Sequence, residues 1–271
     1  VSIINLETTD LLQYAIKFDF YAILLIKECA DDCCCCGRKY YDYSYATMLF
    51  LKPDEIFRMD ESGALPDKGW LLAFHPELLF QTSLKKHIKN YTFFSYRKEE
   101  ALHLSERETS TIICCLENIK EELYHPIDTH TATILSHHIE LMLDYCTRFY
   151  ERQFITREDK NGTILMKFEE LSHNYIISGK LQGSKQPLSE YFACSLNLSA
   201  AYFNDLLKFE TGKTLKEYIQ LKQLEIAKHM LLKTEKSPSV IAQQLGFTSV
   251  QYFSSLFKKL TRCTPNEYKY S

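Results

Sequence analysis

The sequence predicts an α+β protein of two domains, with a β-rich N-terminal part and a wholly helical C-terminal third. Its 271 residues exceed the length of one ordinary domain. Short runs of aromatic and β-branched residues, separated by Gly and Pro, fill residues 1 to about 103, and longer stretches with helical spacing follow. The composition, 45% hydrophobic and 25% charged, excludes wholesale disorder. We expect one domain over residues 1–180 and another over residues 188–271.

Neither a membrane span nor a secretory leader is expected. The longest apolar run, Phe20 to Ile26, has about a third of the length that a spanning helix needs, and it is more typical of a buried strand. Asp10, Lys17 and Asp19 interrupt any hydrophobic region near the start. Ten Cys would suit an oxidising compartment only in a small, loop-rich framework. We therefore expect a cytoplasmic location.

The β-rich part, residues 1–103, contains four runs that predict strands. They are Phe18 to Ile26, Tyr40 to Leu51, Trp70 to Phe74 and Tyr91 to Tyr96. Gly and Pro residues separate these runs and indicate turns. Residues 104–180 are expected to add helices to the same domain.

Two of these helices have recognisable starts. Ser105 and Glu108 form a capping box that opens a helix to about Leu123, and Asp128 precedes a second helix that runs to about Gln153. Apolar residues recur on the second helix at intervals of four and three, the spacing of a coiled-coil seam: Leu135, Ile139, Met142, Cys146 and Phe149. Such a seam packs either against its own domain or against a second subunit, and both interpretations stay open.

A further helix is predicted over Thr163 to Gly179, and Gln182 to Pro187 has the composition of an interdomain linker. Charge differs on the two sides of this linker. From Leu181 onward the chain has 12 Lys and Arg and 7 Asp and Glu, which gives a net charge of +5. Residues 1–180 therefore have a net charge of −8. A basic module suits a polyanion, because neutralised phosphates release counterions. A merely solvated charged surface is the alternative.

The basic third contains an internal repeat. At an offset of 50, nine of the twenty residues from Ser199 to Tyr218 are identical to those from Ser249 to Tyr268. Just upstream the offset is 49, with Ala193 matching Ala242. The second copy therefore has one extra residue in between, which marks a turn.

Each copy predicts a helix, a tight turn and a second helix. In copy two, Ser237 is an N-cap, Pro238 takes the first helical position, and Gly246 ends the helix. Thr248 and Gln251 then have the form of a capping box that opens the next helix. This arrangement is the helix-turn-helix, whose second helix enters the major groove of DNA.

Copy one follows the same plan, with a second helix that begins at Ser199 and ends at Gly212. The stretch Leu215 to Lys233 has no Gly or Pro and predicts a helix that joins the copies. A helix of about 19 residues spans roughly 28 Å, close to the ~34 Å between successive major-groove faces. Two such motifs can therefore occupy adjacent grooves. An all-helical core that binds nothing is the alternative.

Four segments of this third closely resemble the signature of the AraC/XylS family of bacterial transcription regulators: Ile241 to Phe247, Tyr252 to Ser254, Phe257 to Lys259 and Thr264 to Tyr268. The resemblance covers about the last 85 residues. Two residues depart from it. Arg262 stands where the family usually has Gly after the second recognition helix, and Gln223 stands where it usually has Arg on the joining helix.

The resemblance implies that the second helix of each copy contacts bases, at Ala201, Asn204, Asp205, Gln251, Tyr252 and Ser255. Asn204 and Gln251 can pair with adenine, and Asp205 can accept a hydrogen bond from cytosine. Gln251 has a rival role in the capping box. Lys208, Lys258 and Lys259 are expected to contact phosphates, which position a protein without specifying sequence.

For the N-terminal domain, the resemblance implies a cupin-like β-barrel that senses a small molecule. Phe20, Trp70 and Phe74 are candidate pocket residues, although aromatic side chains of this kind also fill a core. If the seam from Leu135 to Phe149 is a subunit interface, the chain forms a homodimer, which would also suit DNA sites arranged as paired elements.

Metal and catalytic sites are not predicted. Cys33 to Cys36 are consecutive, whereas structural zinc sites need spacers between thiolates, so a loop is the preferred interpretation. The β-rich region has no His-x-His, and the chain has no Gly-x-Ser-x-Gly, His-Glu-x-x-His or phosphate-binding Gly loop. No cofactor and no catalytic residue are assigned.

The sequence thus predicts a DNA-binding transcription regulator that responds to a ligand through its N-terminal domain. Its expected partners are double-stranded DNA, a small-molecule effector and, for an activator, RNA polymerase. One alternative is a cupin-like small-molecule enzyme fused to a DNA-binding module. Another is a regulator that responds to a protein partner or to thiol oxidation at Cys33 to Cys36.

Overall fold

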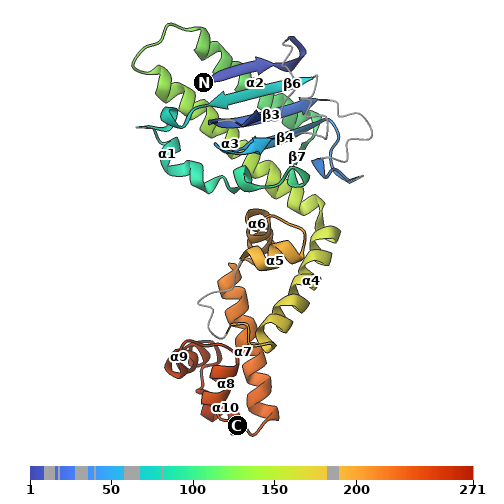
Figure 1. The fold of residues 1–271 in the computed structure, drawn as a ribbon, viewed down its shortest axis with the longest axis vertical. Coiled ribbons are helices and arrows are strands. Elements are labelled where there is room, and N and C mark those ends of the chain that lie inside the picture. Colours follow the sequence, from blue (N-terminus) through green and yellow to red (C-terminus); the bar gives the residue numbers. More distant parts are fainter. Residues whose placement is uncertain are drawn as a thin grey trace. The chain divides into compact units, whose positions relative to one another are not determined.

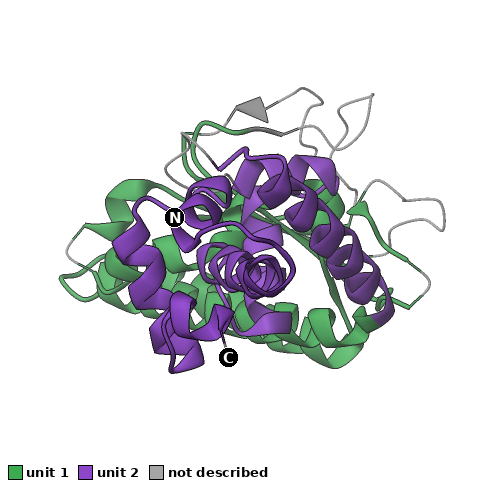
Figure 2. Ribbon diagram, turned by 90° about the horizontal axis from the view of Figure 1, so that it is seen from below, with its two compact units in different colours: residues 1–158 green, residues 159–271 purple. Residues whose placement is uncertain are grey.

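The computed structural model describes residues 1–8, 16–17, 19–27, 36–39, 41–57, 68–80, 82–181 and 189–270. The chain divides into two compact units, Val1–Glu158 and Asp159–Ser271 (Figure 2). This division comes earlier than the linker expected at Gln182 to Pro187, which lies outside the described residues. None of the described helices has both the length and the hydropathy to cross a membrane.

Unit 1 is built on a five-stranded antiparallel sheet (Figure 1). Its strands, in spatial order, are β1 (Ser2–Asn5), β6 (Gly69–Phe74), β3 (Tyr21–Lys27), β4 (Ala46–Leu51) and β7 (Leu102–Leu104). A separate pair consists of β2 (Ile16–Lys17) and β5 (Ile56–Phe57). Within the described ranges the large sheet is open, with β1 and β7 at its edges, so the α+β class is confirmed but a closed barrel is not observed.

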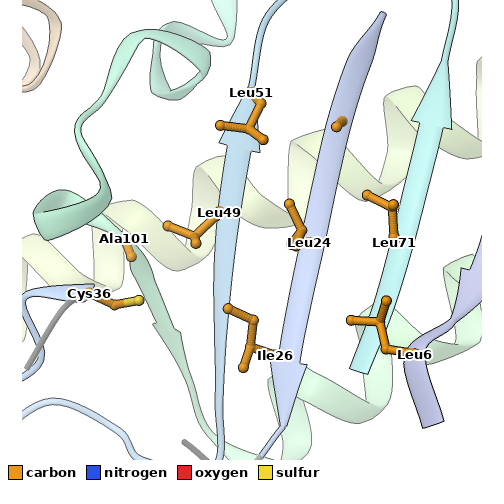
Figure 3. Close-up of a cluster of buried hydrophobic side chains, with 9 residues drawn as sticks. Leu6, Leu24, Ile26, Cys36, Leu49, Leu51, Leu71 and Ala101 are labelled. Carbon is orange, nitrogen blue, oxygen red and sulfur yellow. The ribbon is translucent and has the colours of Figure 1, made fainter. Parts of the chain in front are cut away.

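The central strands are apolar on both faces, which explains why the sheet is covered on both sides. Strand β3 is buried from Ala22 to Ile26, and β4 is buried along its whole length. One face carries a cluster that includes Leu24, Ile26, Leu49 and Leu71. Figure 3 shows these side chains on the face turned away from the helices that lie behind the sheet.

Two long helices cover the other face: α2 (Glu106–Tyr124) and α3 (Thr131–Thr156). The predicted capping box is confirmed, because Ser105 Oγ accepts from Glu108 N and the Glu108 carboxylate accepts from Ser105 N. The Asp128 carboxylate accepts from the backbone N–H groups of His130 and Thr131, which fixes the start of α3.

The seam on α3 lies inside unit 1. All five of its side chains are buried within the single chain: Leu135, Ile139, Met142, Cys146 and Phe149. The Cys146 Sγ lies 3.9 Å from the Met48 Sδ of β4, and burial raises the pKa of the Cys146 thiol. This placement favours the core interpretation over a subunit interface, because a buried seam offers no surface to a second chain.

The run Tyr91 to Tyr96 is not a strand, contrary to the sequence prediction. Residues Thr92–Ser95 form a 3₁₀ helix, η5, and the rings of Phe93 and Phe94 are buried against Phe50. The ring centroids of Phe50 and Phe93 are 4.4 Å apart. Aromatic residues favour strands because they suit a half-buried surface, and here the same rings are buried from a short helix instead.

A buried ion pair ends α3. Arg157, the C-cap residue, donates from Nε and Nη2 to the two carboxylate oxygens of Asp42, each at 2.7 Å. Burial alone would raise the pKa of Asp42, but the hydrogen bonds and charge of Arg157 outweigh it and lower that pKa. The pair joins residues 115 positions apart in the sequence.

Unit 2 is helical. Its helices are α4 (Glu158–Ile177), which starts at the end of unit 1, then α5 (Ser189–Ser195), α6 (Ala200–Thr211), α7 (Leu215–Lys233), α8 (Pro238–Gln244), α9 (Val250–Thr261) and α10 (Pro265–Lys269). The bounds of α7 are those predicted, and α4 begins five residues before the predicted Thr163.

Candidate nucleic-acid interface

The two turns of the repeat have the same geometry. In copy one, Leu198 N donates to Ala193 O at 2.8 Å, and Asn197 between them has a φ of 56°. In copy two, Phe247 N donates to Ala242 O at 3.0 Å, with Gly246 at a φ of 76°. The 49-residue offset of the sequence repeat is therefore also the offset of the backbone turn.

The second helices of the two copies are capped alike, at an offset of 50. Ser199 Oγ accepts from Tyr202 N at 3.1 Å, and Ser249 Oγ accepts from Tyr252 N at 3.0 Å. The capping box predicted at Thr248 is therefore wrong, since Ser249 is the N-cap of α9. Thr248 is the extra residue of copy two, and the change of offset between the copies was the signal that could have identified it.

This correction changes the role of Gln251. It lies one residue too early to serve as the acidic or amide partner of Ser249, and its side chain is exposed on α9. The rival role that the sequence allowed is removed. Gln251 stands at the second position of the helix, where residues of a recognition helix meet base edges.

Both second helices end in a residue with left-handed backbone. Gly212 and Arg262 each have a φ of 67°, and their N–H groups donate to Lys208 O and Lys258 O at 2.8 Å. Gly adopts this conformation without strain, whereas Arg262 costs roughly 1 kcal/mol there. The departure from the family pattern is thus tolerated in backbone geometry but weakens the end of α9.

The predicted base-contact residues lie on the outer faces of α6 and α9. On α6, Ala201, Asn204 and Asp205 are half-buried, whereas on α9, Gln251, Tyr252 and Ser255 are exposed. Hydrogen bonds inside the unit involve Asn204 and Tyr252. Ser189 Oγ donates to Asn204 Oδ1 at 3.1 Å, and Gln220 Nε2 donates to the Tyr252 hydroxyl at 2.8 Å.

The predicted phosphate-contact residues follow on the same helices. Lys208 lies in the last turn of α6, and Lys258 and Lys259 lie in the last turn of α9. All three side chains are exposed. These lysines lie one to two turns after the predicted base-contact residues. Each helix therefore has a neutral or mixed N-terminal part and a positively charged C-terminal end.

Helix α7 holds the two copies together. A capping box between Thr214 and Glu217 opens it, and the backbone N–H of Thr214 helps to lower the pKa of Glu217. Gln223, the second departure from the family pattern, is buried on α7, and its Nε2 donates to Leu245 O at 2.6 Å. It therefore supplies a hydrogen bond to the C-terminal end of α8 rather than a surface contact.

Helix α4 belongs to this unit, whereas the sequence predicted it as part of the N-terminal domain. Phe168 of α4 is fully buried, with its ring centroid 5.0 Å from Phe203 of α6 and 5.3 Å from Phe192 of α5. Asn161 Nδ2 of the same helix donates to Glu210 Oε1 at 3.1 Å. The first helix-turn-helix is thus packed on a helix that lies outside the repeat.

The candidate pocket residues of unit 1 are not brought together. Phe20 packs against the cluster shown in Figure 3, whereas Trp70 and Phe74 point to the opposite face, as strand alternation requires. Lys120 of α2 lies over the Trp70 ring, at 5.5 Å from its centroid, which places Trp70 under the helices.

Of the four consecutive thiols, Cys33 to Cys35 lie outside the described residues and Cys36 is buried in the same cluster as Leu24. Among the side chains that the structure describes, no three His, Cys, Asp or Glu residues gather where they could hold a metal ion.

Comparison with known proteins places residues 192–270 in the family described as Helix-turn-helix domain. The xylose operon regulatory protein of Escherichia coli strain K12 is 36% identical over 75 residues, which are 28% of this chain and 19% of that protein. An uncharacterized HTH-type transcriptional regulator in the cgkA 5′ region of Pseudoalteromonas carrageenovora is 38% identical over 77 residues, 28% of this chain and 45% of that protein. The matched residues thus make up about a fifth of the first relative and just under half of the second.

Among solved structures, the C-terminal domain of the two-component response regulator yesN from Fusobacterium nucleatum is 33% identical, with a TM-score of 0.31, and the match covers 37% of this chain and 96% of that one. The repeat, its paired turns and caps, and the sequence relatives all concern the same residues. Residues 192–270 therefore form a double helix-turn-helix domain similar to those of known transcription regulators, in agreement with the resemblance to the AraC/XylS family.

Proposed function

We propose that this chain is a sequence-specific DNA-binding transcription regulator, in which α6 and α9 enter successive major grooves and unit 1 senses a signal. The observation that carries the proposal is the repeated geometry of turn and cap on two helices that both turn polar side chains outward. A helix of these dimensions fits the major groove, and its side chains can read the donor and acceptor pattern of the bases.

Charge supports the same proposal. The net charge of +5 from Leu181 onward contrasts with −8 before it, so the unit that carries the two helix-turn-helix motifs is the basic one. Exposed Lys208 and Lys258 occupy equivalent positions of the two copies. Each is suited to a phosphate, which would hold both helices in the groove without selecting a sequence.

For unit 1 we propose a cupin-like sensor that binds a small-molecule effector. The support is its sheet, whose two faces are both apolar and buried, with α2 and α3 covering one of them. We further propose a homodimer in the bacterial cytoplasm, because two subunits would match paired DNA elements, and contact with RNA polymerase if the chain activates transcription. No catalytic step is part of the proposal.

Selection from a random duplex library by the full chain tests the function directly. We expect enrichment of a site with two recognition elements, roughly one helical turn apart, and affinity that falls steeply with salt. A variant with Lys208→Ala and Lys258→Ala should bind every duplex more weakly. A folded chain that binds no duplex at low salt would exclude the function.

A further inference from the structure

Unit 2 contains a cavity of about 780 Å³ that is separate from the outer faces of α6 and α9. It lies between the C-terminal end of α4 and the second half of α7, and α8 contributes one wall. The volume is in the range of sites that hold drug-sized molecules. None of the residues expected to contact DNA lines this cavity.

The wall of the cavity is apolar on one side. Ile226 and Met230 of α7 line it together with Leu245, which follows α8 and is buried. Ile177, at the end of α4, adds an exposed apolar side chain to the rim. An apolar body of one or two rings, or a short hydrocarbon chain, would bury surface against these groups.

The polar side of the cavity is positive at one end. Lys236 Nζ donates to the neutral Gln244 Oε1 at 3.0 Å, and among the described residues it has no carboxylate partner. His173 and His229 face the same space. Lys222 and Glu225 also line the cavity, and Lys222 is paired with two carboxylates, those of Glu169 and of Glu225, the latter at 3.1 Å, so this part of the wall has no uncompensated positive charge. Lys236 is therefore the lysine of this cavity whose positive charge no described carboxylate compensates.

The cavity touches the elements that set the second helix-turn-helix. Gln223 of α7 donates to Leu245 O beside the cavity. Gly246 forms the turn before α9 and lies so close to Leu181 that an added Cβ would stand 2.5 Å from the Leu181 Cβ. An occupant that contacts α4, α7 and α8 together would stabilise one arrangement of these helices over others.

We propose that this cavity binds an amphipathic organic anion, with an apolar body against Ile226, Met230 and Leu245 and its charged group at Lys236. Occupancy changes the affinity of the chain for DNA, because it favours one placement of α8 and the turn that leads to α9. The second statement rests on the proposed DNA-binding function, whereas the first does not.

The first experiment uses 8-anilinonaphthalene-1-sulfonate as the probe and titration calorimetry on the full chain. Met230→Trp fills the cavity and should abolish the binding that depends on it. Leu232→Trp is the matched control, because Leu232 is 61% exposed on the same helix and does not line the cavity. Circular dichroism confirms that both variants are folded. Equal binding of the probe by the two variants overturns the site.

The second experiment tests the charge of the ligand. Lys236→Gln should weaken the sulfonate about three- to tenfold, as expected for one partly solvated ion pair. It should leave the uncharged N-phenyl-1-naphthylamine nearly unchanged. Lys233→Gln, on the last turn of α7 and outside the cavity, should affect neither probe. An equal loss for both probes in Lys236→Gln overturns the choice of an anion.

The third experiment measures DNA affinity with and without a saturating concentration of the sulfonate. A change that is present in the unmodified chain and absent in Met230→Trp supports the coupling. Binding of the probe without any change in DNA affinity overturns it. A chain that binds the probe but no DNA refutes the proposed function and leaves the cavity assignment standing.

Discussion

The rings of Tyr218 in α7 and Phe168 in α4 pack together with their centroids 5.0 Å apart, whereas the equivalent Tyr268 of copy two packs on Phe257 of its own repeat at 5.4 Å. The position of copy one that corresponds to Phe257 is Leu207. Copy one thus takes from α4 the aromatic partner that copy two carries itself. We infer that α4 is a structural part of the double helix-turn-helix unit.

The first prediction follows from this packing. In a fragment of residues 159–271, Phe168→Ala should lower the free energy of unfolding by about 3–5 kcal/mol, the usual cost of emptying a buried aromatic site. Met166→Ala, two residues away and 67% exposed, should change it by less than about 0.5 kcal/mol. Urea denaturation followed by circular dichroism gives both values. Equal stability of the two variants would refute a structural role for α4.

The second prediction uses the matched ends of α6 and α9. Arg262→Gly should raise the free energy of unfolding of unit 2 by about 0.5–1 kcal/mol, because Gly relieves the left-handed strain. Gly212→Ala should lower it by about 1 kcal/mol through strain alone, since an added Cβ meets no atom within 4 Å. Thermal unfolding of the two variants checks the opposite signs. A change of the same sign in both would show that backbone strain does not decide these ends.

The third prediction concerns the acid stability of unit 1. His103 pairs with Thr47 at 3.1 Å and is wholly buried, and this burial lowers the pKa of His103 to about 4. Below about pH 6.5 the His103 side chain therefore binds a proton in the unfolded chain but stays neutral in the folded chain. Stability should fall by about 1.4 kcal/mol per pH unit as the pH drops from 6.5 towards 4.

Trp70, the one Trp of the sequence, lies in unit 1, so its fluorescence during urea unfolding reports this stability at each pH. His103→Gln should remove most of the slope between pH 6.5 and 4.5. The exposed His130→Gln should retain it. The lowered pKa of Asp42 acts below this range, so it does not imitate the effect. An unchanged slope in His103→Gln would exclude His103 as its source.

The fourth prediction separates positioning from recognition. Lys258→Ala should weaken binding to all duplexes alike and reduce the slope of log affinity against log salt by about one. Lys208→Ala, at the same position of copy one, should do the same. Lys89→Ala, exposed in unit 1, is the control and should leave the slope unchanged. Altered base preference in Lys258→Ala would place this side chain on a base edge instead of a phosphate.

The helices of unit 2 were predictable because local signals determine them. Ser199, Thr214 and Ser237 each occupy an N-cap, and Gly212 occupies the left-handed position at a helix end. The internal repeat shows the same pattern of helices and turns twice, so each copy supports the prediction made for the other. Ser249 was missed because Thr248 with Gln251 has the i, i+3 pattern of a capping box, and this local pattern was preferred over the change of repeat offset, which identifies Thr248 as the extra residue.

Long-range packing explains the rest of the differences. The Asp42 and Arg157 pair joins a loop to a helix end 115 residues away, and no local pattern indicates it. The spacing of Leu135 to Phe149 predicted an apolar face but not the surface that covers it, which is the sheet of the same unit. In the sequence, Phe168 is one aromatic residue on a predicted helix, and nothing nearby indicates its partner. The structure shows that its ring packs against Phe203.

The last prediction concerns Gln251, whose role the cap at Ser249 clarifies. Gln251 is exposed at the second position of α9, and the hydroxyl of Ser249 already accepts from Tyr252 N at 3.0 Å. Gln251→Ala should therefore leave the helix intact. It should cost about 1–3 kcal/mol on the selected site and relax the preference at one base pair, since a bidentate contact with adenine would be lost.

Ser249→Ala is the matched variant, because it removes the cap and keeps the Gln251 amide. It should lower the free energy of unfolding of unit 2 by about 1 kcal/mol, while base preference stays as it was. Affinity for the selected site and its single-base variants, measured together with thermal unfolding, distinguishes the two. If Gln251→Ala lowered stability as Ser249→Ala does and left base preference unchanged, Gln251 would be a helix-end residue, and α9 would face the groove with a different set of side chains.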